Sequence, residues 1–226
     1  MQKKLHMRIH PLGYKIIAIT VLLLTSVNVL LWILLPIALY WLLVFIIPSL
    51  VLLVLVIRFF RYPSRTPLHI EDNVVVAPAD GLIVTIENVD NDRFMKAPGI
   101  QISIFMSPYN VHLNWVPIDG TAEEVTYLPG KYLLARNPKS SMLNEMVCAV
   151  FKNQYGKTIV VKQIAGIVAR RIIPFLKSGD VCKKGDELGF IRFGSRVDVI
   201  LPVGSEVLVK IGDKTKGLET AIARLI

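Results

Sequence analysis

The sequence predicts a mainly β soluble domain, a sandwich or barrel-sandwich-like fold, preceded by an N-terminal α-helical membrane hairpin. Two observations lead to this prediction. First, residues 16–57 form a run of 42 residues that contains no Asp, Glu, Lys, Arg or His. Second, the chain after residue 71 consists of short apolar or alternating segments separated by turns rich in Gly, Asp and Pro. Such a succession of short strands is typical of sandwiches and small barrels.

The uncharged run is long enough for two membrane crossings, because one helical crossing takes about 20 apolar residues. We expect one helix at about residues 16–35 and another at about residues 37–57, separated near Pro36, which breaks a helix. A re-entrant hairpin is the alternative, since no polar loop separates the two halves. A cleaved signal peptide fits less well, because the run is too long and lacks a small-residue cleavage site.

The positive charge of the chain is concentrated around this run. The net charge is +9, and residues 1–70 hold seven basic residues and no acidic one. The charge is therefore a property of the membrane flanks and does not indicate nucleic-acid binding. The positive-inside rule places both flanks in the cytoplasm. We expect a basic N-terminus at 1–15, the hairpin at 16–57, a linker at 58–70 and a β-rich domain at 71–226.

The strands of this domain are predicted from alternation and turn residues. Residues 74–86 form a strand, a tight turn at Asp80-Gly81 and a second strand. Further strands are predicted at 101–105, 111–116, 121–127, 149–152, 158–162, 188–193, 197–201 and 207–211. Lys177–Asp180 and Lys183–Asp186 are turns, and residues 132–145 and 164–171 give no clear prediction.

Metal and nucleotide sites are not indicated. Cys148 and Cys182 lack the spacing of a metal or redox motif, and His112 is the only histidine well inside the domain. One histidine without ligands at suitable spacing does not make a zinc site. No Walker or Gly-x-Gly-x-x-Gly motif occurs. We expect both cysteines to be reduced structural residues.

Three residues could carry chemistry, although each has an ordinary interpretation. Ser195 follows Gly194 in the middle of a strand-like segment, which by itself indicates a bulge with a surface serine. His112 alternates in a strand, as half-buried structural histidines do, and Asp80 lies in an Asp-Gly turn. Together they supply the parts of an Asp-His-Ser relay, but geometry must decide whether they meet.

Four stretches, taken in order, resemble the phosphatidylserine decarboxylase proenzyme family, in its short bacterial form with an N-terminal hydrophobic hairpin. They are Ala77-Pro-Ala-Asp-Gly81, Phe105-Met-Ser-Pro-Tyr-Asn-Val-His-Leu-Asn-Trp-Val-Pro-Ile-Asp-Gly120, Gln163-Ile-Ala-Gly-Ile-Val-Ala-Arg-Arg171 and Phe193-Gly-Ser-Arg-Val-Asp-Val-Ile-Leu-Pro202. The resemblance extends over essentially the whole chain.

The resemblance implies that the chain cuts itself between Gly194 and Ser195. Serine attack on the preceding carbonyl gives an ester, and elimination leaves Ser195 as an N-terminal pyruvoyl group, the pyruvate-derived cofactor. The products are a large chain 1–194 and a small chain 195–226, which form a heterodimer; a higher oligomer is compatible with this. The resemblance also implies that His112 is the base acting on Ser195 and that Asp80 holds its imidazole.

The implied reaction is decarboxylation of phosphatidylserine to phosphatidylethanolamine through a Schiff base, at the cytoplasmic side of the bacterial inner membrane. Six basic residues are candidates for binding the lipid phosphate: Lys131, Arg136, Arg170, Arg171, Arg192 and Arg196. Tyr109 is a further candidate for binding the substrate.

The chain departs from the family pattern at two points. Many members have a second histidine where this chain has Tyr109, and the cleavage site reads Phe-Gly-Ser-Arg instead of Leu-Gly-Ser-Thr or Gly-Ser-Ser. A second Gly-Ser pair, Gly204-Ser205, follows Leu-Pro-Val and is interpreted as an ordinary turn.

Two other functions remain open from the residues. One is a membrane-anchored serine hydrolase that uses the same three residues without self-cleavage. The other is a lipoyl- or biotinyl-type binding module, whose turns resemble those at Ala77–Gly81 and Lys177–Asp186, although no convincing modified lysine is found.

Overall fold

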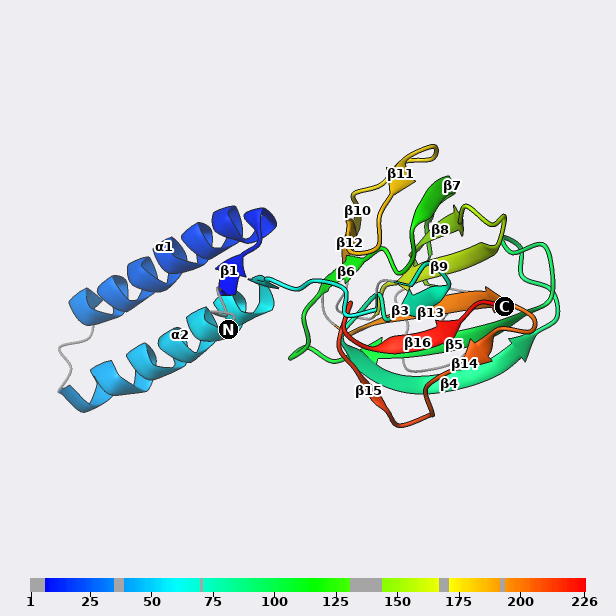
Figure 1. Cartoon of the computed structure of the whole chain (residues 1–226). Helices are drawn as coiled ribbons and strands as arrows, with labels where there is room; N and C mark the ends of the chain where they lie inside the picture. Colours follow the sequence, from blue (N-terminus) through cyan, green and yellow to red (C-terminus); the bar gives the residue numbers. More distant parts are fainter. Residues whose placement is uncertain (1–6, 35–38, 70, 131–143, 167–170, 192–193) are drawn as a thin grey trace. The chain divides into compact units, whose positions relative to one another are not determined.

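The structure is a computed structural model, and it describes residues 7–34, 39–69, 71–130, 144–166, 171–191 and 194–226. The chain forms two compact units, which divide within the predicted linker, between Ser64 and Arg65. The first unit is helical and the second consists of β-strands (Figure 1). The predicted fold class is therefore confirmed.

The first unit is a helical hairpin. Helix α1 spans Pro11–Leu34 and α2 spans Leu39–Phe59, while β1, Met7–Ile9, pairs with β2, Arg61–Pro63. Among the described residues, α1 is the one helix both long and apolar enough to cross a membrane, and the described apolar part of α2, Leu43–Phe59, is shorter. The predicted break at Pro36 lies outside the described residues.

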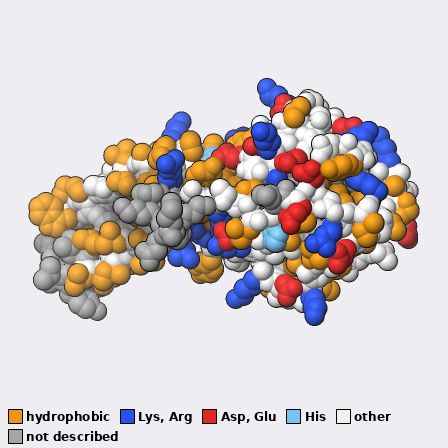
Figure 2. Space-filling model, in the orientation of Figure 1, with side chains coloured by type: hydrophobic (Ala, Val, Ile, Leu, Met, Phe, Trp, Pro, Cys, Tyr) orange, Lys and Arg blue, Asp and Glu red, His pale blue; other side chains and the backbone are white. Residues whose placement is uncertain are grey.

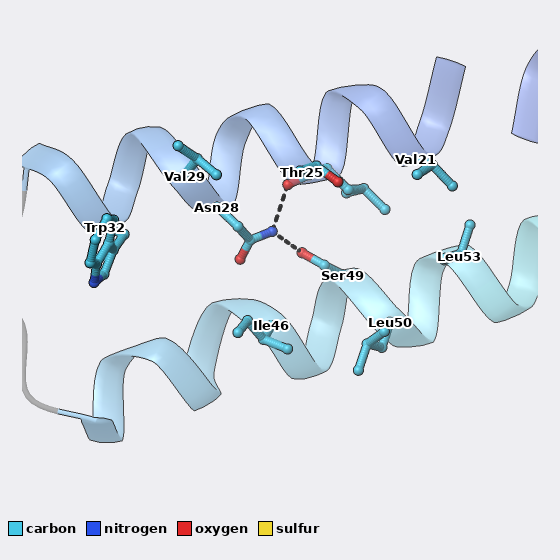
Figure 3. Close-up of a pocket in the computed structure, with 10 residues that line it drawn as sticks. Val21, Thr25, Asn28, Val29, Trp32, Ile46, Ser49, Leu50 and Leu53 are labelled. Carbon is cyan, nitrogen blue, oxygen red and sulfur yellow. Dashed lines mark hydrogen bonds between the residues drawn. The ribbon is translucent and has the colours of Figure 1, made fainter. Parts of the chain in front are cut away.

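The two helices face each other across an apolar groove, and a side-chain hydrogen bond joins them there (Figure 3). Asn28 Nδ2 donates to Ser49 Oγ on the other helix at 2.9 Å and to the carbonyl of Leu24 at 2.7 Å. The groove has a volume of about 480 Å³. A side-chain hydrogen bond in apolar surroundings fixes the register of two helices, because the alternative is an unsatisfied polar group.

The described residues of the second unit form three antiparallel sheets. Eight strands form a curled half-barrel in the order β11-β7-β8-β9-β13-β5-β4-β15, and two three-stranded sheets, β10-β12-β6 and β14-β16-β3, complete the unit (Figure 1). The strands are β3 Val74–Val76, β4 Gly81–Val89, β5 Gly99–Met106, β6 Leu113–Trp115, β7 Gly120–Leu128, β8 Met146–Lys152, β9 Thr158–Ile164, β10 Ile172–Pro174, β11 Val181–Cys182, β12 Glu187–Ile191, β13 Ser195–Pro202, β14 Glu206–Val207, β15 Lys214–Thr215 and β16 Ala221–Arg224.

Strand β13 lies in the centre of the half-barrel, between β9 and β5. Its side chains alternate between the two faces of the sheet. Val197 and Val199 point into the main core with Ile102 and Ile104, and all four are fully buried. Ser195 has the same parity as Val197, so it belongs to the core face. The serine of the predicted cleavage site therefore lies on the core side of the sheet.

Three turns share the pattern Lys-x-Gly-Asp. In the turns at Lys177, Lys183 and Lys210 the lysine N–H donates to the Asp side chain three residues later, at 2.7–2.8 Å. The glycines have φ values of 94–104°, which favour glycine. The first two turns confirm the prediction. The third replaces the second half of the strand predicted at 207–211, which was wrong because Gly212-Asp213 forces a turn.

The other face of the half-barrel contains a buried ion pair between Lys162 and Asp92, whose side chains are 11% and 8% exposed. Burial alone would raise the pKa of Asp92, but the Lys162 ammonium and the N–H groups of Met95 and Phe94 together lower it below its ordinary value. The pair therefore contributes stability above the unfolded-state pKa of about 4, and this contribution is lost as the pH falls further.

We expect Lys162→Met to lower the free energy of unfolding by about 3 kcal/mol at neutral pH, because it leaves an unpaired buried carboxylate. The loss should shrink below about pH 4, where Asp92 becomes protonated. Thermal unfolding of the full chain in detergent at neutral and acidic pH measures both values. The control is Lys152→Met, which removes a half-exposed pair with Glu123 and should change stability by under about 1 kcal/mol. An equal loss at both pH values would contradict the prediction.

Candidate active site

The predicted cleavage bond lies where the chain passes from one sheet to another. Strand β12 ends at Ile191 in a three-stranded sheet, and β13 begins at Ser195 in the half-barrel. Between them Gly194 has a φ of 62°, in the left-handed region that glycine adopts without strain. Gly194 itself forms a bend directly before β13, and this conformation is the reason for a glycine at that position.

Ser195 is fully buried. The interpretation as a surface serine is therefore wrong, because the parity of β13 turns this side chain toward the core. Ser195 lies opposite Met106 on β5, and its hydroxyl donates to Met106 Sδ at 3.5 Å. A thioether is a weak acceptor, so this hydrogen bond holds the proton of the hydroxyl weakly.

His112 immediately precedes β6 and is fully buried. Its carbonyl accepts the N–H of Ile191 at 3.1 Å, and the next residue, Leu113, pairs with Phe190. The fold thus brings the backbone of His112 beside the end of β12, three residues before Gly194. This proximity was not visible in the sequence, because the two segments are far apart along the chain.

Asp80 lies in the predicted turn before β4 and is 8% exposed. It forms a two-point ion pair with Arg65, in which Arg65 Nη2 donates to Oδ2 at 3.0 Å. The N–H of Gly217 also donates to Asp80 Oδ1 at 2.8 Å, and the Arg65 guanidinium lies 5.4 Å from the Trp115 ring centre. Asp80 is thus fixed by a cation and a backbone donor. That it holds the imidazole of His112 stays a prediction.

The described candidates for binding the substrate do not lie together. Tyr109 is 67% exposed and Arg171 is also exposed, so both are open to a ligand. Arg196 is buried on the face of β13 opposite to Ser195 and pairs with Asp198 at 2.5 Å and 2.9 Å. The arrangement gives the predicted phosphate contact of Arg196 no support. The remaining candidates lie outside the described residues: Lys131, Arg136, Arg170 and Arg192.

Comparison with known proteins gives a consistent result. The family model for phosphatidylserine decarboxylase matches residues 52–223. A phosphatidylserine decarboxylase proenzyme of Phocaeicola vulgatus is 43% identical, with 100% of this chain and 98% of the relative covered. Those of Parabacteroides distasonis and Bacteroides thetaiotaomicron are 46% and 40% identical, covering 78% and 100% of this chain and 80% and 98% of the relatives.

The chain belongs to the phosphatidylserine decarboxylase family. This confirms the resemblance drawn from the four sequence stretches, and it makes the protein a member of a decarboxylase family. The matched residues, 52–223, include the whole β unit except its last three residues.

The second Gly-Ser pair of this decarboxylase family member is a structural turn. Gly204 has a φ of 90°. The Ser205 hydroxyl donates to the carbonyl of Pro202 at 2.7 Å and its N–H donates there at 3.2 Å. A hydroxyl engaged with a backbone carbonyl in a tight turn stabilises that turn. The geometry agrees with the interpretation of Gly204-Ser205 as an ordinary turn.

Sequence reasoning missed two buried amides beside Ser195. Asn114 and Gln163 are both fully buried, and Gln163 Nε2 donates to Asn114 Oδ1 at 2.8 Å. Asn114 Nδ2 in turn donates to Met106 Sδ at 3.5 Å, the same sulfur that accepts the Ser195 hydroxyl. Asn114 follows His112 by two residues in an alternating strand, and this spacing could have revealed it.

The thiols offer no competing nucleophile. Cys148 and Cys182 are free and buried, and burial raises the pKa of both. Protonated thiols are poor nucleophiles and poor metal ligands. Within the described residues, no group of three His, Cys, Asp or Glu side chains is placed to hold a metal ion.

Proposed function

We propose that this protein is a phosphatidylserine decarboxylase that makes its own pyruvoyl cofactor by cutting the bond between Gly194 and Ser195. The observation that carries the proposal is the setting of Ser195, a fully buried hydroxyl directly after a glycine in the left-handed region, at the junction of two sheets. Among the described residues, the Ser195 hydroxyl donates to a weak acceptor, the Met106 thioether. The burial of this serine fits a self-cleaving bond, because water is kept from the reacting groups.

In the self-cleavage step, Ser195 loses its proton to a base and its Oγ attacks the carbonyl carbon of Gly194. The peptide C–N bond breaks, the nitrogen of residue 195 takes a proton, and an ester joins the two residues. Loss of the Cα proton of residue 195 then breaks its Cβ–Oγ bond and releases the Gly194 carboxylate. Addition of water and loss of ammonia leave a pyruvoyl group on residue 195. We assign the base to His112 and the orientation of its imidazole to Asp80.

The surroundings of residue 195 fit such a group. The position is fully buried, and the Ser195 hydroxyl and the Asn114 amide donate to the same sulfur, Met106 Sδ. The pyruvoyl carbonyl supplies an electron sink for the carbanion that remains after loss of CO2. The buried site keeps water from protonating or hydrolysing the reacting groups early.

The proposal places the helical hairpin in the bacterial inner membrane and the β domain on its cytoplasmic side. Support comes from the exposed apolar side chains along α1 and α2, such as Leu22, Ile33 and Val54, which are 60–67% exposed. Figure 2 shows hydrophobic side chains over the visible face of the hairpin, whereas the β domain carries interspersed acidic and basic ones. Basic flanks on both sides of the apolar run support the cytoplasmic orientation.

The test of the function uses the purified full chain in vesicles that contain phosphatidylserine. We expect release of CO2 from the serine headgroup and formation of phosphatidylethanolamine, with free serine not consumed. The small chain should be lighter than the unmodified peptide 195–226 by one ammonia. Release of fatty acid by an intact 226-residue chain would instead support the membrane-anchored serine hydrolase and overturn the proposal.

A further inference from the structure

Four buried side chains from four strands form a chain of contacts that ends at Ser195. Gln163 on β9 donates to Asn114 on β6, Asn114 donates to Met106 Sδ on β5, and Ser195 on β13 donates to the same sulfur. All four residues have an exposed fraction of 0%. Gly189 makes room for the Gln163 amide, because a Cβ there would lie 2.8 Å from Gln163 Oε1.

This polar chain is poorly satisfied. A thioether is a weak acceptor, yet the N–H of Asn114 and the O–H of Ser195 both end at it. Within the described part of the chain, Gln163 Oε1 is buried and accepts no hydrogen bond. Burying polar groups with poor partners costs stability, and such groups in a native structure call for an explanation in function.

We propose that the Asn114 amide, oriented by Gln163, is the hydrogen-bond donor that stabilises the negative charge developing at the Gly194–Ser195 bond during self-cleavage. This inference rests on the proposed function. Since Gln163 Nε2 occupies Asn114 Oδ1, the amide must present its N–H groups to the side on which Met106 and Ser195 lie. Within the described part of the chain this amide donates to a sulfur, which is a weak acceptor, so little hydrogen-bond energy is lost when the N–H turns to an oxyanion.

The charge in question arises in the first step. When Ser195 Oγ bonds to the Gly194 carbonyl carbon, the carbonyl electron pair moves onto oxygen. That oxyanion collapses when the C–N bond breaks and nitrogen takes the proton. A donor placed in advance, in a water-excluded site, lowers this barrier, and removing one such donor slows reactions of this kind by about 10²–10³-fold.

The test must distinguish loss of the Asn114 hydrogen-bond donor from disturbed packing of the core. Asn114→Leu alone would leave the Gln163 amide with no partner at its N–H groups, which destabilises the fold. The double variant Asn114→Leu/Gln163→Met replaces both amides by apolar groups of similar size, a change that is nearly neutral for stability. Stability is compared by thermal unfolding, with the double change added to the uncleavable Ser195→Ala chain. We expect the two melting temperatures to agree within about 5 °C.

Cleavage of the otherwise wild-type chain is followed by intact mass over time. We expect the double variant to be cut about 10²-fold more slowly than wild type. The matched control is Gln101→Met, which replaces a buried amide on β5 outside this chain of contacts and should be cut within about 3-fold of the wild-type rate. A double variant cut at the wild-type rate, or a Gln101→Met chain slowed as much as the double variant, would overturn the assignment.

Two further results keep the test decisive. If the double variant melts much lower than its parent, Gln163→Met is measured by itself. This variant keeps the Asn114 amide but removes the hydrogen bond that orients it. We expect cleavage about 10-fold slower, and an unchanged rate would overturn the role of Gln163 in orienting Asn114 and with it the proposal. If the wild-type chain itself stays whole, the proposed function fails. If wild type is cut and the variants are cut at the same rate, the inference about Asn114 fails while the proposed function stands.

Discussion

We expect the Ser195→Ala protein to remain a single chain of 226 residues and to show no decarboxylation. Alanine keeps the Cβ but has no oxygen to attack the Gly194 carbonyl, so neither the ester nor the pyruvoyl group can form. Removing the nucleophile of a serine-based site typically lowers the rate by several orders of magnitude. Intact mass of the purified chain and CO2 release from phosphatidylserine vesicles measure the two losses separately.

The control is Ser205→Ala, which changes the other Gly-Ser pair. Its hydroxyl serves a turn, so this variant should be cut and active, with stability lower by about 1 kcal/mol for the lost hydrogen bond. A Ser195→Ala chain that is still cut between the same residues would show that another group performs the cleavage. A wild-type chain that is active while whole would remove the pyruvoyl mechanism.

We expect His112→Ala to slow self-cleavage by about 10²–10⁴-fold, the usual contribution of a positioned general base. The backbone of His112 lies beside the end of β12, at Ile191, three residues before Gly194 in the sequence. The readout is the fraction of cut chain against time after synthesis. Because His112 is fully buried, His112→Gln is measured beside it, since glutamine keeps hydrogen-bonding groups but is not a base.

Both variants should mature slowly, while His69→Ala, outside this site, should mature as wild type does. His112→Ala maturing at the normal rate would show that His112 is not the base. If the variant matures slowly but its cut fraction then decarboxylates at the wild-type rate per pyruvoyl group, His112 acts in self-cleavage alone.

The parts of this fold that sequence predicts are those determined by local pattern. The hairpin of β8 and β9 follows from two alternating apolar runs about a Gly turn, and the two helices follow from an uncharged run. In each case the residues that predict the element are neighbours in the sequence. The strand ends were off by a few residues, because the pairing partner determines where a strand stops.

The parts that could not be predicted depend on residues distant in the sequence. Arg65, which lies in the predicted linker, pairs with Asp80, and the backbone of Gly217 completes that site. No local signal marks an arginine after a membrane segment as the partner of an acid in a β-turn. Likewise, the alternation of β13 tells which residues share a face with Ser195, but only the sheet order shows that this face is the inner one.

The position of β13 in the half-barrel has a consequence for the cut protein. The small chain 195–226 would contribute β13, β14, β15 and β16, and β13 is hydrogen-bonded on both sides to strands of the large chain. Cutting one peptide bond at the beginning of this strand leaves every one of those ladders in place. The two chains would then share one sheet that formed when the precursor folded, and they could not dissociate without unfolding. Maturation would be irreversible, and a mature enzyme that unfolds could not be rebuilt from its fragments as readily as the precursor folds.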